Sequence, residues 1–149
     1  MTDIIIALLV LLFLTILFLI PNFKIVRANE VQIVERLGRF HKMLSEPGIH
    51  FIVPLIDRVI QVVPLLESHK KFHFKINKDE EEITYHLEYR YKVADVMLFV
   101  YAALDSLEAI EIHMKNIIEE QDVIDETALL ALQEVSLTFG IELIDIQSK

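Results

Sequence analysis

The chain has 149 residues, of which 54% are hydrophobic and 25% charged, with no cysteine and a formal net charge of −9. The acidic balance argues against a nucleic-acid partner, and the lack of cysteine excludes disulfides. Residues 1–78 hold ten Lys and Arg against six Asp and Glu, whereas residues 79–149 hold four against seventeen. The first half therefore suits an anionic membrane surface that repels the second half, although solvated acidic helices would explain the second half nearly as well.

The N-terminal run from Ile4 to Ile20 contains one polar side chain, Thr15, and no charge. As a helix of seventeen residues it spans about 25 Å, slightly short of a ~30 Å hydrocarbon core. Pro21 ends such a helix without kinking its middle. A cleaved secretory signal and a buried core helix are the alternatives. A signal peptide is disfavoured because no basic residue precedes the run, where Asp3 is the only charge, and because no small-x-small cleavage site follows it. A core helix is disfavoured because a chain this short can hardly surround it. We therefore expect a retained transmembrane anchor, residues 1–22.

The charges that flank the anchor predict its orientation. Basic residues are retained on the cytoplasmic side, so the short N-terminus should face outward and residues 23–149 should form one cytoplasmic domain of a single-pass protein. Phe23, Ile25 and Val26 can extend the apolar contact into the interface. The predicted headgroup-binding residues are the basic side chains of this membrane-proximal stretch: Lys24, Arg27, Arg36, Arg39, Lys42 and Arg58.

Several short extended segments are predicted next. Residues 30–40 read as a strand, in which Val31 and Ile33 alternate with Gln32 and Val34, and which turns at residues 37–40. Residues 45–48 are a strong turn signal, and the extended segment 49–59 should be interrupted at Pro54, with extended chain resuming over 60–64. Part of this segment could form a shallow apolar wedge into the membrane interface, with core packing as the alternative. The wedge residues are Pro47, Gly48, Ile49, Phe51, Ile52 and Pro54.

A long period-two pattern predicts a two-stranded antiparallel unit with one buried face. Its strands are joined by the polar turn 77–81. Tyrosines on the apolar face are expected to pack in the core or between subunits. The apolar positions are Phe72, Phe74 and Ile76 before the turn, and Ile83, Tyr85, Leu87, Tyr89 and Tyr91 after it.

Helices should cover that face. Residues 94–103 predict a short helix, and Asp105 with Glu108 predicts the capped start of a second. A third helix should begin near Asp122 or Asp125 and end before Gly140, a left-handed C-cap. A final strand over 141–146 completes an α+β fold of antiparallel strands packed by two or three helices. In the second helix the apolar stripe is Leu107, Ile110, Met114, Ile117 and Ile118, with Glu111, Lys115 and Glu119 opposite.

Three stretches share the motifs of a known family. They are residues 23–31, residues 34–40 with the sequence V-E-R-L-G-R-F, and residues 46–59, which contain P-G-I-H-F-I-V-P-L-I-D-R. In order and spacing they resemble the start of an SPFH (band-seven, PHB) domain of the stomatin, prohibitin and flotillin superfamily, and most closely the bacterial stomatin-like slipins. The tail 139–146 resembles that family's exit from helix to strand.

The resemblance implies a non-enzymatic membrane scaffold that self-associates and organises membrane microdomains. It also implies partners such as membrane proteases or their small membrane-protein companions. Relatives continue into a coiled coil, whereas no heptads are sustained here over three or more repeats, so we expect a short form. The alternative is a small accessory or inhibitory subunit that docks onto a full-length SPFH oligomer.

Signatures of catalysis are missing from the sequence: there is no P-loop, G-x-G-x-x-G, G-x-S-x-G or H-E-x-x-H. His69 and His73 would pair on a helix, but in a strand they lie about 13 Å apart. Residues 80–82, three consecutive glutamates, read as a solvated turn. We therefore expect no catalytic residues, no metal site and no cofactor, and a membrane-attached enzyme or ligand-binding module remains a third hypothesis.

Overall fold

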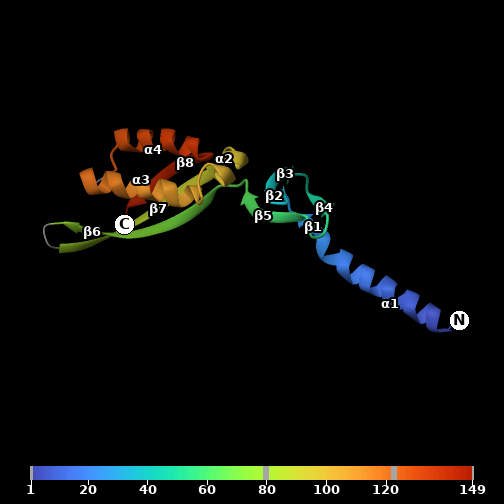
Figure 1. Ribbon diagram of the computed structural model, residues 1–149. Coiled ribbons are helices and arrows are strands. Elements are labelled where there is room, and N and C mark those ends of the chain that lie inside the picture. Colours follow the sequence, from blue (N-terminus) through green and yellow to red (C-terminus); the bar gives the residue numbers. More distant parts are fainter. Residues whose placement is uncertain (1, 79–80, 122–123, 149) are drawn as a thin grey trace. The chain divides into compact units, whose positions relative to one another are not determined.

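A computed structural model describes residues 2–78, 81–121 and 124–148 of the chain (Figure 1). It divides into two compact units, residues 1–63 (unit 1) and residues 64–149 (unit 2). The boundary falls inside the stretch 23–149, for which one domain was expected.

Unit 1 begins with the apolar helix α1 (Thr2–Leu19), which continues into a 3-10 turn, η1 (Ile20–Asn22). All residues of α1 are exposed, and its length of about 27 Å is close to the thickness of a hydrocarbon core. The hydroxyl of Thr15 donates to the carbonyl of Leu11 at 2.8 Å, which satisfies the one polar side chain of its middle turns. By length and composition this helix can cross a membrane.

The rest of unit 1 consists of short antiparallel strands. β1 (Phe23–Val26) pairs with β4 (Gly48–Phe51), and β2 (Glu30–Arg36) lies between β3 (Arg39–Leu44) and β5 (Asp57–Pro64). The segment 49–59 is interrupted around Pro54, as predicted, and its two halves join different sheets. The core of unit 1 contains Val26, Val34, Leu44 and Ile52, with Val59 packed against them.

The central strand β2 differs from the sequence prediction in its length and its burial. It ends at Arg36, because Leu37 and Gly38 have positive φ angles and form the turn to β3. The predicted alternation of buried and exposed residues is wrong, since Gln32 and Val34 are buried along with their neighbours. Consecutive burial of residues 31–34 shows that both faces of β2 are covered, as in strands that lie inside a core. The Gln32 amide donates to the carbonyl of Ile25 at 2.8 Å, which satisfies it inside the core.

Unit 2 is a three-stranded antiparallel sheet with helices on one face. β7 (Glu81–Val93) lies between β6 (Ser68–Lys78) and β8 (Ile141–Ser148). Helices α2 (Val96–Tyr101), α3 (Ser106–Gln121) and α4 (Glu126–Thr138) follow β7, and α3 and α4 lie over the same face of the sheet (Figure 1). The predicted hairpin and final strand are confirmed; residues 79 and 80 of the predicted turn lie outside the described residues. The buried sheet face comprises Phe74, Ile76, Leu87, Tyr89, Tyr91, Ile141 and Leu143.

Aspartates cap the helices of unit 2. The Asp105 carboxylate accepts from the backbone N–H groups of Leu107 and Glu108, as predicted for the start of α3. Asp125 caps α4 by accepting from the N–H of Ala128 at 2.7 Å. Asp122, the other predicted start, lies outside the described residues. Each cap satisfies backbone donors that a helix start leaves without a partner.

One expectation for α3 is wrong: Glu111 does not face solvent. It is buried against the sheet, where its carboxylate accepts from the Tyr89 hydroxyl at 2.7 Å and lies 2.8 Å from the Lys70 ammonium. Burial raises the pKa of Tyr89, and this hydrogen bond to a carboxylate raises it further. The apolar stripe of α3 does not predict the burial of Glu111, because a position beside the stripe contacts the sheet only in the folded structure.

Gly140 joins α4 to β8 with a left-handed φ of 71°, as the sequence predicts. Its carbonyl accepts from the N–H groups of Ala94 and Asp95, at 2.9 and 3.1 Å, so the backbone that leads into α2 approaches it closely. A Cβ atom here would collide with the Asp95 carbonyl and the backbone nitrogen of Phe99. The position therefore needs glycine for two independent reasons.

We expect Gly140→Ala to destabilise the protein more than Gly38→Ala. Gly38 also has a positive φ, of 79°, but open space surrounds it. Alanine should cost about 1 kcal/mol from backbone strain at either position, and about 1–3 kcal/mol more at Gly140 from the collision. Denaturant unfolding followed by circular dichroism in detergent measures both variants, and equal losses would contradict the close approach.

Candidate membrane-contacting surface

Asn22 links the apolar helix to the first strand pair of unit 1. Its side-chain amide donates to the carbonyl of Phe18 at 2.8 Å, and its backbone carbonyl accepts from the N–H of Ile52 at 3.0 Å. We call the pair β1 and β4 the β1–β4 ribbon. The ribbon thus begins directly after η1, and the hydrogen bond from Ile52 joins the end of β4 to the same point.

The β1–β4 ribbon exposes an apolar face. Phe23 lies opposite Phe51 and Ile25 opposite Ile49, and alternate residues of a strand share a face. The two phenyl rings lie 5.3 Å apart, and Ile25 and Ile49 are 68% and 72% exposed. Contiguous exposed apolar side chains indicate a contact with a protein or a membrane.

The predicted wedge residues lie in different environments. Pro47, Gly48, Ile49 and Phe51 are exposed. Ile52 is buried in the core of unit 1, so its side chain cannot enter an interface. Pro54 is half-buried, and further exposed apolar residues follow it, Val53, Leu55 and Ile56 being 37%, 90% and 36% exposed.

Pairing also places Phe23 and Ile25 beside the wedge, whereas Val26, the third residue expected to extend the apolar contact, is buried. From the sequence alone, Phe23 and Ile25 were expected only to extend the apolar contact of the anchor. The register between β1 and β4, which joins segments more than twenty residues apart, makes them one face with Ile49 and Phe51.

The predicted headgroup residues are spread over four strands and a turn. Arg36 and Arg39 are opposite each other in the β2–β3 register, Lys24 lies on β1, Lys42 on β3 and Arg58 on β5. Arg27, Arg39 and Arg58 are exposed, while Lys24 and Lys42 are half-buried. In the turn before β2, the backbone N–H of Arg27 donates to the Glu30 carboxylate at 2.8 Å, which lowers the pKa of Glu30.

Arg36 has a structural role instead of a free charge. Its Nε and Nη2 atoms donate to the two carboxylate oxygens of Asp57 at 2.7 and 3.0 Å, and the N–H of Val53 donates to the same carboxylate at 2.9 Å. The Asp57 side chain is only 1% exposed. The hydrogen bonds from Arg36 outweigh desolvation and lower the pKa of Asp57 to about 2. The pair therefore fixes the loop 52–57, which carries part of the apolar surface.

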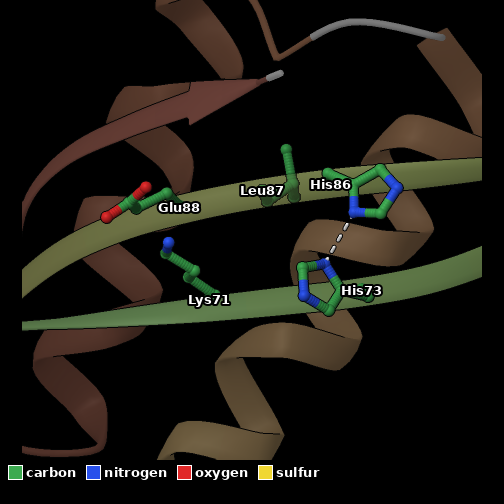
Figure 2. A pocket seen from close by; sticks show the side chains of 5 residues that line it. All are labelled: Lys71, His73, His86, Leu87 and Glu88. Atoms are coloured by element: carbon green, nitrogen blue, oxygen red, sulfur yellow. Dashed lines mark hydrogen bonds between the residues drawn. The ribbon is translucent and has the colours of Figure 1, made fainter.

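The helix-free face of the unit 2 sheet has polar groups that could hold a ligand. Lys71, His73, His86, Leu87 and Glu88 line an open hollow of about 250 Å³, and the two imidazoles meet across β6 and β7 (Figure 2). His69, four residues before His73, instead lies opposite Arg90. Glu82 forms an ion pair with Lys75 at 3.0 Å. Among the described residues no group of three or more His, Cys, Asp or Glu side chains is placed to hold a metal ion.

Comparison with known proteins identifies the fold. The profile of the SPFH domain / Band 7 family matches residues 24–121. The chain belongs to this family. The matched region runs from the second residue of β1 through α3, and it contains the β1–β4 ribbon except Phe23 as well as the Arg36–Asp57 pair. The resemblance of the sequence motifs to the SPFH superfamily is thereby confirmed.

Curated relatives of the SPFH domain match shorter stretches. The chain is 29% identical to protein HflK of Treponema pallidum (strain Nichols) over 62 residues, or 42% of this chain and 19% of that protein. It is 38% identical to mitochondrial stomatin-like protein 2 of Rattus norvegicus over 53 residues, 36% of this chain and 13% of the relative. For the protein of that name from Homo sapiens the values are 46% over 39 residues, 26% and 11%. The matches thus span less than a fifth of these relatives' length.

The Arg36–Asp57 pair should make stability depend on pH in acid. The folded pKa of Asp57, about 2, lies below its ordinary value of 3.8, so the folded state binds this proton less readily than the unfolded state. Its stabilisation is fully present above about pH 4 and is lost as the pH falls toward 2. We expect Asp57→Asn to be less stable than wild type at pH 7, with the difference shrinking through this window.

Urea unfolding between pH 2 and pH 7 measures this difference. Glu46→Gln is the matched control, because Glu46 is an exposed carboxylate of the same unit. A difference for Asp57→Asn that stays constant down to pH 2 would mean that the carboxylate does not act as a charge.

Proposed function

We propose that this protein is a membrane-anchored, non-enzymatic scaffold of the stomatin type. Helix α1 crosses the bilayer once, and the SPFH domain lies on the cytoplasmic side. There it organises lipid and membrane proteins laterally. Membership of the SPFH family supports the scaffold role, and the apolar helix supports the membrane location.

The observation that carries this proposal is the exposed apolar face of the β1–β4 ribbon where the membrane helix ends. A helix that leaves the bilayer at Asn22 places the next residues at the level of the lipid headgroups. Phe23, Ile25, Ile49 and Phe51 then find apolar surroundings that water would not provide. Each fully transferred side chain of this size gains roughly 1.5–3 kcal/mol, so the ribbon adds a second, shallow contact to the anchor.

Basic residues support the proposed orientation. Lys24 and Arg27 directly follow the helix, and exposed Arg39 and Arg58 lie in the same unit. Near an anionic inner leaflet each such charge contributes about 1 kcal/mol. Arg36 contributes less in this scheme, because Asp57 already compensates its charge.

The proposed partners follow from the family. We expect first that the protein associates with itself or with other SPFH proteins. A membrane protease or a small membrane-protein companion is the second expectation. The similarity to HflK and to stomatin-like protein 2 supports a partner of the SPFH family for this chain.

Lipid contact of the ribbon can be tested with single cysteines, because the chain has none of its own. Spin labels at Ile49→Cys, His50→Cys and Glu119→Cys are placed in the full chain in anionic liposomes. We expect the label at position 49 to be accessible to oxygen and shielded from a water-soluble nickel relaxant. Position 50 is on the opposite ribbon face, and exposed position 119 on acidic α3 is the aqueous reference. Equal access of the nickel relaxant to the labels at positions 49 and 119 would contradict contact between the ribbon and the membrane.

Self-association can be tested by crosslinking in native membranes, followed by size analysis and mass spectrometry of the products. We expect products that contain more than one copy of this chain, or this chain with another SPFH protein. A chain that stays monomeric at every crosslinker concentration would contradict the scaffold role while leaving the membrane contact intact.

A further inference from the structure

Two histidines face each other on the exposed side of the unit 2 sheet. His73 of β6 and His86 of β7 are direct partners in the antiparallel register. Their Nδ1 atoms lie 2.9 Å apart, and their ring centres 4.7 Å apart, in an edge-on arrangement. Both side chains are exposed and border the open hollow, so an ion from solvent can reach both nitrogens (Figure 2).

The contact requires one ring to carry hydrogen on Nδ1 and the other to offer its Nδ1 lone pair. A neutral imidazole can instead carry its hydrogen on Nε2. If solvent exchange moves the shared hydrogen to the Nε2 atom of its own ring, both Nδ1 lone pairs become available, and rotation of the exposed rings about their Cβ–Cγ bonds turns them toward one ion in the hollow. The pair then offers two neutral nitrogen ligands without net loss of a proton.

The spacing of these nitrogens selects a coordination geometry. With metal–nitrogen bonds of about 2.0–2.1 Å, as for imidazole on zinc, a separation of 2.9 Å gives an angle near 90°. Tetrahedral coordination would need roughly 3.4 Å at the same bond length. Right angles separate adjacent positions of square-planar, tetragonal and octahedral ions. Among these, Cu²⁺ and Ni²⁺ favour nitrogen ligands in tetragonal coordination, and Cu²⁺ binds such ligands more tightly.

We propose that His73 and His86 form a two-histidine chelate for a tetragonal divalent transition metal, with Cu²⁺ the preferred ion. Water fills the remaining positions. The proposal concerns unit 2 alone and does not depend on the membrane-scaffold function.

Neighbouring charges permit a cation here. Lys75, two residues beyond His73 on β6, is paired with Glu82 at 3.0 Å. Lys71, two residues before His73, lies opposite Glu88 in the register, and both line the hollow. The acidic partners thus offset the two lysines closest along the strand to the chelate.

Binding should stabilise the β6–β7 pairing. The two ligands come from different strands and meet only when β6 and β7 are in this register. An ion that binds the paired state and not the unfolded chain raises the apparent stability as its concentration rises. A metal-dependent rise in the melting temperature is therefore expected together with binding.

The experiment uses the full chain in detergent and a non-chelating buffer. Cu²⁺ is titrated and followed by calorimetry, by the melting temperature and by electron paramagnetic resonance. We expect a tetragonal spectrum with hyperfine splitting from two nitrogens, and tighter binding of Cu²⁺ than of Zn²⁺. His73→Gln and His86→Gln should each lose affinity by about tenfold or more, since loss of a ligand costs at least as much as loss of an outer-shell partner. His69→Gln, an exposed histidine of the same strand, should change it by less than about twofold.

Circular dichroism of the metal-free variants shows whether they keep the fold. Equal affinity in wild type and the His73→Gln/His86→Gln double variant would overturn the site, since the remaining copper would then be bound elsewhere. So would a loss in His69→Gln as large as in His73→Gln. Tighter binding of Zn²⁺ than of Cu²⁺ would overturn the tetragonal geometry.

Discussion

The proposed membrane surface depends on one interaction, the ion pair between Arg36 and the buried carboxylate of Asp57. A buried carboxylate without partners would be costly, but two N–H groups of the Arg36 guanidinium and the backbone N–H of Val53 donate to this one. The pair joins the end of β2 to the start of β5, and the N–H of Leu37 reaches the carbonyl of Ile56 at 2.9 Å beside it. Because these bonds hold the loop 52–57 in place, Leu55 and Ile56 can stay exposed while Ile52 remains in the core.

The structure of unit 2 depends on a different constraint: the apolar face that β6 and β7 present on one side of the sheet must be covered. Helices α3 and α4 cover that face with apolar side chains, and a polar contact accompanies them at Glu111. Its carboxylate meets the Tyr89 hydroxyl and the Lys70 ammonium, so two residues of the sheet bind one residue of the helix. Such a contact can be made in one register only, which we expect to fix how α3 lies on the sheet more than to add stability.

The two units present opposite kinds of surface. Unit 1 exposes paired apolar side chains of β1 and β4, which suits contact with lipid. The helix-free face of unit 2 is polar, with ion pairs such as Lys75–Glu82 and the histidine pair between β6 and β7. In the proposed scaffold, therefore, the unit next to the anchor meets the bilayer, and the charged unit remains available to water, ions and other proteins.

The sequence alone determined features whose signal is local. Continuous hydrophobicity gave the helix α1, period two gave β6 and β7, and Asp105 and Gly140 marked the start of α3 and the end of α4. Family motifs gave the SPFH fold, and with it most of the proposed function. Tertiary structure decided which distant residues meet: β1 with β4, Arg36 with Asp57, Glu111 with Tyr89, and His73 with His86 instead of His69. Strand register and the packing of a helix on a sheet set those pairs, and neither is encoded in the spacing of residues along one segment.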